Sequence, residues 1–168
     1  MSDIESSILK LARRLGIISG KKALQKYVYF LQEAESVPLG LRYDMYQYGP
    51  YSQELEWTTR EMEATRRINV RVVDETFQIS TTYAGSDSEP DPVINRLVEK
   101  LGENRPRDLE LLASLHYLAS LRPYGATPPE KASLKEKLLL WKGTKFSAAQ
   151  IESGIAKLES IGYLPTGT

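Results

Sequence analysis

The chain has no cysteine among its 168 residues and only one histidine, His116. The lack of cysteine excludes disulfide bonds, thiolate metal ligands and cysteine nucleophiles. A zinc site would need several histidine or carboxylate ligands at close spacing, and the sequence has no such cluster. We therefore expect no bound metal and no cofactor. A Ser-His-Asp triad would have to use His116.

Long apolar runs are lacking as well, because no stretch approaches the roughly 18 residues that a membrane-spanning helix needs. The first five residues are acidic and helix-like, without the basic region and apolar stretch of a signal peptide. We therefore expect a cytoplasmic protein without a membrane partner. With 41% hydrophobic and 26% charged residues, the chain can bury the core of one domain, or of two small domains that share it.

Net charge is the third thing that the sequence lacks, since 22 basic and 22 acidic side chains cancel. A protein that binds duplex DNA usually has a basic excess, because neutralisation of phosphates supplies most of its affinity. DNA binding would therefore require the basic side chains to gather in patches.

Apolar residues recur at helical spacing over about 3–15 and again over about 20–36. The aromatic-rich run 42–48 predicts a short strand. Pro50 suits the first turn of a third helix, which is expected to run to about Arg66.

Two β-rich runs, 68–73 and 76–83, flank the polar pair Asp74-Glu75 and predict a β-hairpin. The order helix, helix, strand, helix, hairpin is that of a winged helix. We therefore predict a winged-helix-like module over residues 1–84.

Residues 85–92 combine proline with serine and acidic residues, and predict a linker. Beyond the linker only helices are expected, beginning near Val93, Asp108, residue 130 and Ser147. Residues 93–168 thus form a predicted helical module, which either stands alone or shares one core with the first. The predicted fold class is α+β, mostly α-helical, with a winged-helix-like N-terminal half packed with a C-terminal helical half.

Several segments resemble the YwgA-like family of uncharacterised bacterial proteins. They are Gly20–Lys26, Tyr27–Phe30, Tyr48–Leu55, Leu109–Leu118 and Lys145–Gly154. The piece Tyr48-Gly49-Pro50-Tyr51-Ser52 is the most specific of them. The resemblance spans most of the chain in the same order, and it implies no activity and no catalytic residues.

The N-terminal half is similar, more distantly, to the SocA-like Panacea antitoxins. The shared features are an apolar helix that ends in Tyr29-Phe30 and a Gly49-Pro50 pair before the next helix. This similarity implies a protein-binding role, as in antitoxins or protease adaptors. It does not reach residues 85–168.

The third predicted helix is acidic, with four glutamates and one arginine before Arg66. In a winged helix this element would enter the major groove, where carboxylates are repelled by phosphates. An acidic helix fits a basic protein partner better. Spacings of three and four place Glu54, Trp57 and Glu61 on one side of it. Our leading hypothesis is a non-enzymatic protein-binding module that uses these three side chains.

Trp57 points away from the apolar stripe of the third helix by about half a turn. We expect it to pack on the C-terminal helices. If it is exposed instead, it would mark a contact with a partner protein or with a second copy in a homodimer, since tryptophan is enriched at interface hot spots.

The alternative function is a winged-helix DNA-binding transcriptional regulator. Its phosphate contacts would come from two basic groups, Lys21, Lys22 and Lys26 after the first helix and Arg66, Arg67 and Arg71 at the hairpin. The same residues could equally be solvated charges on helix faces.

Two further groups have both a structural and a functional interpretation. Tyr43, Tyr46, Tyr48 and Tyr51 can stack on bases or anchor peptides, but we expect them to be half-buried core. His116 lies on the most apolar helix, and we expect a core residue. An enzyme with His116 as general base in a small pocket is the third hypothesis.

Overall fold

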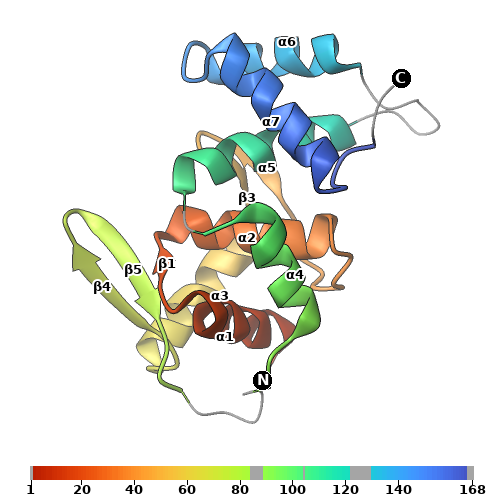
Figure 1. Ribbon diagram of the computed structural model, residues 1–168. Helices are drawn as coiled ribbons and strands as arrows, with labels where there is room; N and C mark the ends of the chain where they lie inside the picture. Colours follow the sequence, from red (N-terminus) through yellow and green to blue (C-terminus); the bar gives the residue numbers. More distant parts are fainter. Residues whose placement is uncertain (1, 84–88, 104, 122–129, 166–168) are drawn as a thin grey trace.

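The computed structural model describes residues 2–83, 89–103, 105–121 and 130–165, which form the predicted α+β, mostly helical chain (Figure 1). Its elements are α1 (Asp3–Leu15), β1 (Ile18–Ser19), α2 (Lys21–Glu33), β2 (Asp44–Tyr46), β3 (Gly49–Tyr51), α3 (Gln53–Ala64), β4 (Asn69–Val73), β5 (Thr76–Ser80), α4 (Pro92–Leu101), α5 (Pro106–Ser120), α6 (Lys131–Lys142) and α7 (Ala148–Ser160). Along the described ranges, no helix combines the length and apolar character that crossing a membrane requires.

The predicted hairpin is present as β4 and β5, which pair antiparallel around Asp74-Glu75. Both turn residues have positive φ, 49° and 64°, as a two-residue turn matched to the twist of a hairpin requires. The two-residue strand β1 adds to β5, with Ile18 opposite Ile79, and gives a three-stranded sheet in the order β1-β5-β4. The sequence analysis missed β1, because so short a strand is defined by its partner and not by its own pattern.

The short strand predicted over 42–48 is present only over Asp44–Tyr46, as β2, and the prediction of a helix that starts at Pro50 is wrong. The chain instead reverses after Tyr46, and Pro50 lies in β3, paired with β2. Gly49 permits the reversal because its φ of 96° lies in the region that favours glycine. The next helix, α3, starts only after Ser52, whose hydroxyl accepts the N–H of Leu55 at 3.3 Å.

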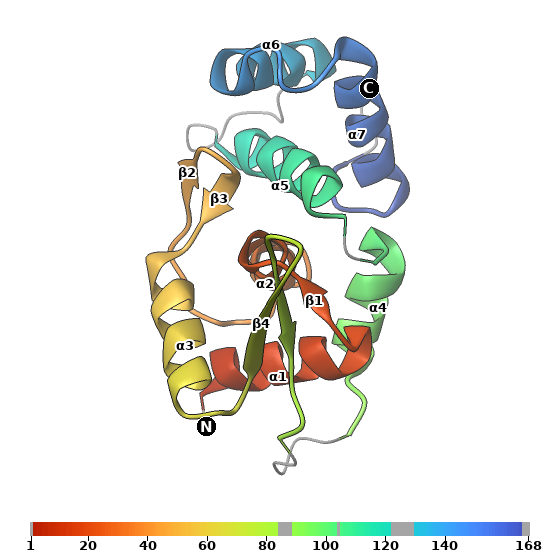
Figure 2. The same ribbon diagram turned by 90° about the vertical axis from the view of Figure 1, so that its left-hand side faces the viewer.

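Helix α2 is the centre of the molecule. Nine consecutive residues, 23–31, are buried. The helices α1, α4 and α5 and the strands β1 and β3 all pack on α2. Figure 2 shows α5 above α2, with α6 and α7 stacked on the other side of α5. The buried residues of both halves of the chain therefore form one cluster.

Two glutamines of α2 hold the segment that leads from α2 to α3. The side-chain amide of Gln25 donates to the carbonyl of Ser52 at 3.0 Å and accepts its N–H at 2.9 Å. Gln32 makes the same pair of bonds to Leu41, at 2.8 and 2.7 Å. The hairpin β2–β3 is thus fixed at both ends against α2.

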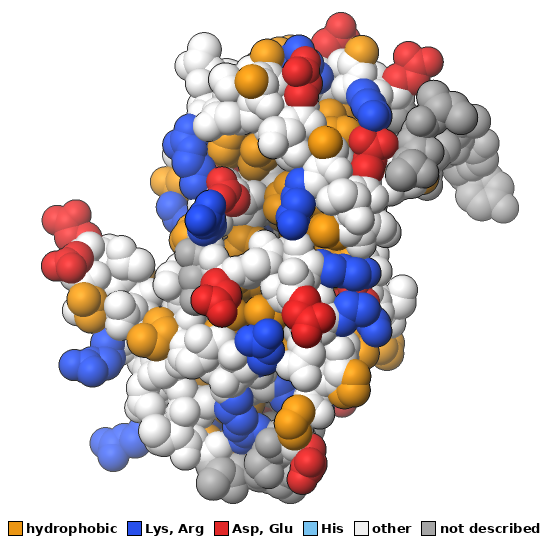
Figure 3. Space-filling model, in the orientation of Figure 1, with side chains coloured by type: hydrophobic (Ala, Val, Ile, Leu, Met, Phe, Trp, Pro, Cys, Tyr) orange, Lys and Arg blue, Asp and Glu red, His pale blue; other side chains and the backbone are white. Residues whose placement is uncertain are grey.

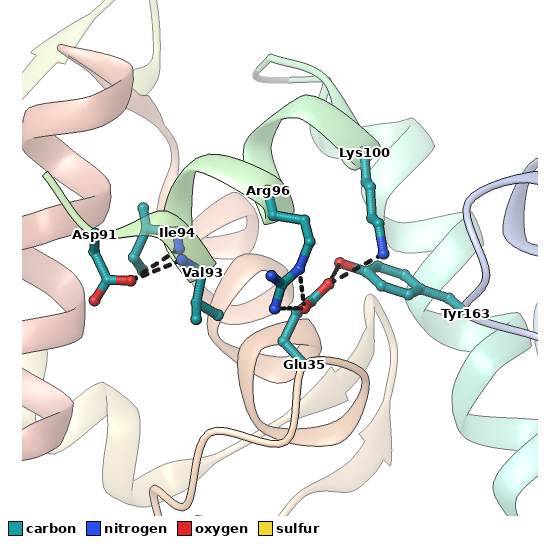
Figure 4. Close-up of polar contacts among 7 residues, drawn as sticks. All are labelled: Glu35, Asp91, Val93, Ile94, Arg96, Lys100 and Tyr163. Atoms are coloured by element: carbon teal, nitrogen blue, oxygen red, sulfur yellow. Dashed lines mark hydrogen bonds and ion pairs between the residues drawn. The ribbon is translucent and has the colours of Figure 1, made fainter.

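The predicted linker extends too far toward the C-terminus. Asp91 is the N-cap of α4, since its carboxylate accepts the N–H groups of Val93 at 2.9 Å and Ile94 at 3.3 Å (Figure 4). Asp91 also pairs with Lys10 of α1 at 3.2 Å. The rest of the predicted linker is Glu89-Pro90, which are described as exposed coil, and residues 85–88, which lie outside the described residues.

A buried carboxylate after α2 connects that helix to α4 and to the C-terminal segment. The side chain of Glu35 is 5% exposed and pairs with Arg96 at 2.7 Å and Lys100 at 3.6 Å (Figure 4). The hydroxyl of Tyr163 donates to it at 2.6 Å. Burial acts to raise the pKa of Glu35, but the Tyr163 hydrogen bond and the two cations hold it below its usual value.

Glu35→Gln is expected to lower the free energy of unfolding at pH 7 by about 2 kcal/mol, because it removes the charge that three donors share. The lowered pKa of Glu35 means that its contribution is present above pH 4.5 and is lost as the pH falls below that value. Urea unfolding at pH 7 and pH 3 should therefore show the two proteins converging at low pH. Glu99→Gln, on the exposed side of α4, is the matched control and should change little.

Candidate functional site

The outer side of α3 carries the three residues that were predicted to bind a protein. Leu55, Thr59 and Met62 face inward and are buried, whereas Glu54, Trp57 and Glu61 are exposed. The prediction that Trp57 packs on the C-terminal helices is wrong, because its side chain is 60% exposed. The reason is the stacking order: α6 and α7 pack on α5 and lie away from α3 (Figure 2).

The two carboxylates beside Trp57 are unneutralised. In the part of the chain that the structure describes, the side-chain carboxylates of Glu54 and Glu61 form no hydrogen bond and no ion pair. The one arginine of α3, Arg60, pairs with Glu56 at 2.8 Å instead. The outer side of α3 is therefore an exposed indole between two free negative charges.

The first basic group splits between the surface and the interior. Lys21 lies over the ring of Phe77 at 4.8 Å, and Lys22 lies over the ring of Tyr48 at 3.1 Å. Lys26 is only 2% exposed and donates to the carbonyl of Pro50 at 2.8 Å. Its assignment as a contact to the phosphates of duplex DNA is therefore wrong, because β3 and α5 cover that side of α2 and a DNA backbone cannot reach it.

The second basic group is also divided. Arg66 and Arg71 are exposed, but Arg67 forms an ion pair with Glu5 of α1. The tip of the hairpin is acidic, since both of its turn residues, Asp74 and Glu75, are exposed. Figure 3 shows these red side chains at the end of the projecting hairpin, and interspersed charges of both signs on the rest of this face.

A second charged group, which the sequence analysis did not find, surrounds the buried carboxylate of Glu110 on α5. Its oxygens lie 2.7 Å from the ammonium of Lys145 and 3.3 Å from that of Lys142. Lys142 also donates to the carbonyl of Gln47 in the turn between β2 and β3. This Glu110 cluster, formed by Glu110, Lys142, Lys145 and the neighbouring Lys26, connects α6 to α5 and to the hairpin.

Burial lowers the pKa of Lys26 to about 7. The negative charge of Glu110 offsets part of this effect, while Lys142, Lys22 and Lys145 add to it. At neutral pH the amine is therefore poised between its charged and uncharged forms, which in a structure marks a residue worth testing for function.

A pocket of about 210 Å³ opens between the first turns of α2, the hairpin β2–β3 and α3. The hairpin supplies Tyr46, Tyr48 and Tyr51 to its lining, and α2 supplies Lys21, Lys22, Leu24, Gln25 and Lys26. Gly49, Glu56, Thr59 and Arg60 complete it. No single stretch of sequence contains this set, so only the fold brings it together.

The tyrosine cluster was expected to be half-buried core, and the structure divides it. Tyr43 is buried against Tyr29, with ring centroids 5.1 Å apart. Tyr46 and Tyr48 are exposed, at 53% and 38%, and the ring of Tyr46 meets that of Tyr51 edge to face. The exposed tyrosines belong to the pocket.

His116 is a core residue, as expected. Its Nδ1 lies 2.8 Å from the hydroxyl of Tyr29, and Phe30 contacts the ring edge to face. Burial lowers the pKa of His116 to about 4, so the ring is neutral at pH 7. His116 does not line the pocket. Among the described residues no group of three or more histidines and carboxylates could hold a metal ion.

An exposed apolar group lies on α6, formed by Leu139, Leu140 and Trp141, and Leu140 is 86% exposed. The sequence indicates this exposed group, because residues 138–141 are all apolar. Four consecutive residues of a helix point in different directions and cannot all face one core. Of the four, only Leu138 is buried.

Comparison with known protein families finds none whose sequence pattern matches the chain, and no curated protein matches it either.

Proposed function

We propose that the chain is a non-enzymatic protein-binding module, antitoxin-like or adaptor-like, that holds a basic segment of another protein against α3. The observation that carries the proposal is the exposed indole of Trp57 between the carboxylates of Glu54 and Glu61. Lysine or arginine side chains of a partner would pair with the carboxylates, and a guanidinium would stack on the indole.

The winged-helix-like description of residues 1–84 is part of this proposal. It is supported by three helices followed by a hairpin, with β1 added to the hairpin's second strand. In such a module α3 would be the helix that approaches a duplex, and its acidic outer side favours a protein partner over DNA. The distant resemblance of the N-terminal half to the Panacea antitoxins points in the same direction.

The alternative is a DNA-binding transcriptional regulator that uses Lys21, Lys22, Arg66 and Arg71. The exposure of Lys22, Arg66 and Arg71 favours it. The acidic hairpin tip and the burial of Lys26 count against it. A homodimer through the apolar group on α6 is compatible with either function.

Trp57→Ala is expected to weaken capture of the protein partner by about 30-fold, the effect of removing a hot-spot tryptophan. Glu54→Lys combined with Glu61→Lys should weaken it further, because attraction becomes repulsion. The measurement is affinity purification of the tagged chain from nuclease-treated lysate, followed by titration of the captured protein. Glu63→Lys is the control, since it makes the charge change of one of these two substitutions on the opposite side of α3.

A protein that the native chain and Glu63→Lys retain, and that Trp57→Ala loses, would support the proposal. Equal capture by all variants would contradict the proposal that the partner protein binds to α3. If capture disappears with nuclease treatment, and binding to duplex DNA falls steeply with added salt, the regulator is the better description.

A further inference from the structure

The pocket between α2, the hairpin β2–β3 and α3 has the size of a single-ring ligand. Its volume is about 210 Å³, whereas an apolar cavity of about 150 Å³ is enough to hold benzene. Tyr46, Tyr48 and Tyr51 contribute aromatic rings to its lining, and Leu24 contributes further apolar surface. A planar ring therefore fits, with room for one substituent.

The charge of the lining is positive. Four cationic side chains, Lys21, Lys22, Lys26 and Arg60, line the pocket against a single carboxylate, Glu56. That carboxylate is already paired with Arg60 at 2.8 Å. Lys21 and Lys22 contact the rings of Phe77 and Tyr48 and pair with no carboxylate among the described residues, so their charges are left to meet an anion. Lysine acts on phosphate as a compact point charge.

Three polar side chains that line the pocket are buried, those of Gln25, Lys26 and Thr59, and they differ in whether their hydrogen-bonding groups are all used. The side-chain amide of Gln25 is bonded to the backbone of Ser52 through both its nitrogen and its oxygen. The hydroxyl of Thr59 donates to the carbonyl of Leu55 at 2.7 Å. The ammonium of Lys26 donates to Pro50, and no other hydrogen bond or ion pair to it exists among the described residues. An ammonium has three donors, so a buried cation with unused donors lies next to the space.

The start of α2 adds to the same preference. Lys21 and Lys22 occupy its first turn, and the N-cap Gly20 provides no side-chain hydrogen bond to the first amides. The positive end of the helix dipole thus lies at residues that line the pocket. This contribution is secondary to the cavity and its lysines.

We propose that this pocket binds a phosphate ester of a single aromatic ring, with the ring between the tyrosines and the phosphate on Lys22 and Lys26. On α3 the pocket is lined by Glu56, Thr59 and Arg60, so it shares no residue with the proposed protein contact at Glu54, Trp57 and Glu61. The ligand can be a free aryl phosphate or a phosphotyrosine side chain, since both present the same group.

The test is titration calorimetry of the full chain with phenyl phosphate as the probe. Two further probes each lack one part of it: inorganic phosphate lacks the aromatic ring, and phenol lacks the phosphate. Phenyl phosphate is expected to bind with a Kd on the order of 0.1–1 mM, and each half probe at least tenfold more weakly. Lys22→Gln should weaken phenyl phosphate about tenfold, because it removes a charge-assisted contact. Lys157→Gln, which removes an exposed charge on α7, should leave Kd unchanged.

Lys26→Met should abolish binding, and the exposed Lys22 keeps the test decisive if that variant does not fold. Inorganic phosphate that binds as well as phenyl phosphate would overturn the proposal, as would Lys22→Gln and Lys157→Gln with the same Kd. Calorimetric titration with a tyrosine-phosphorylated peptide distinguishes a phosphotyrosine side chain from a free aryl phosphate. If the peptide binds more tightly than phenyl phosphate, and Lys22→Gln abolishes this binding, the ligand is a phosphorylated protein. Equal or weaker binding of the peptide assigns a free small molecule.

Discussion

Glu110→Ala is expected to lower the free energy of unfolding by about 3–5 kcal/mol, the usual cost of removing one partner from a buried ion pair. The side chain of Glu110 is 6% exposed and that of Lys142 is 4% exposed, so water cannot replace the lost carboxylate without rearrangement. Lys26 would lose the negative charge that offsets part of its burial. The cost is therefore repulsion among lysines in addition to two lost ion pairs.

Urea unfolding followed by circular dichroism measures this loss. Glu136→Ala is the matched control, because it removes an exposed glutamate from α6 and should change stability by less than about 0.5 kcal/mol. A second variant, Glu110→Leu with Lys142→Met, should recover part of the loss, since an apolar pair can replace a buried ionic one. A loss below about 1 kcal/mol in Glu110→Ala would show that the lysines are solvated without it.

Acidification from pH 6.5 to pH 4 is expected to lower the free energy of unfolding by roughly 3 kcal/mol through His116 alone. The pKa of His116 is about 4 in the folded chain, because of burial, and 6.5 when it is unperturbed. Between these values the unfolded chain binds a proton that the folded chain does not bind, so stability falls as the pH falls. The slope is about 1.4 kcal/mol per pH unit for a single group.

The measurement is a series of urea unfolding curves between pH 7 and pH 5, an interval above the range in which carboxylates titrate. His116→Gln should flatten the profile in this interval, and it keeps an amide that can bond to the hydroxyl of Tyr29. The chain has no other histidine, and Lys26, whose pKa is about 7, titrates in both proteins, so the difference between the two slopes belongs to His116. Equal slopes in the two proteins would show that His116 can be protonated in the folded state.

The helices could be predicted because their apolar spacing and their caps are local. Residues 3–15 match α1, and Ser147 forms the capping box with Gln150 that its spacing indicates. The hairpin followed from two β-rich runs around Asp74-Glu75. These features depend on neighbours in sequence and not on the rest of the fold.

What the sequence could not show are features that depend on distant partners. Lys26 looks like a surface residue in its local sequence, and its burial follows from β3 and from Glu110 on α5. Trp57 was placed on the correct side of α3, but its exposure depends on where α6 and α7 stack. The pocket combines three elements, and no periodicity in one of them predicts the others.

The central position of α2 has a consequence for how the chain folds as it leaves the ribosome. The hydroxyl of Tyr29 reaches His116, which is 87 residues farther along the chain, and α5 covers one whole face of α2. Until α5 has been synthesised, that face of α2 remains exposed to water, and the earlier residues can form their helices but cannot close their core. Contacts of such long sequence separation slow folding and lengthen the time during which apolar surface is open to aggregation. Synthesis of α5 therefore allows the core around α2 to close, and the other side of α5 is covered only when α6 and α7 follow.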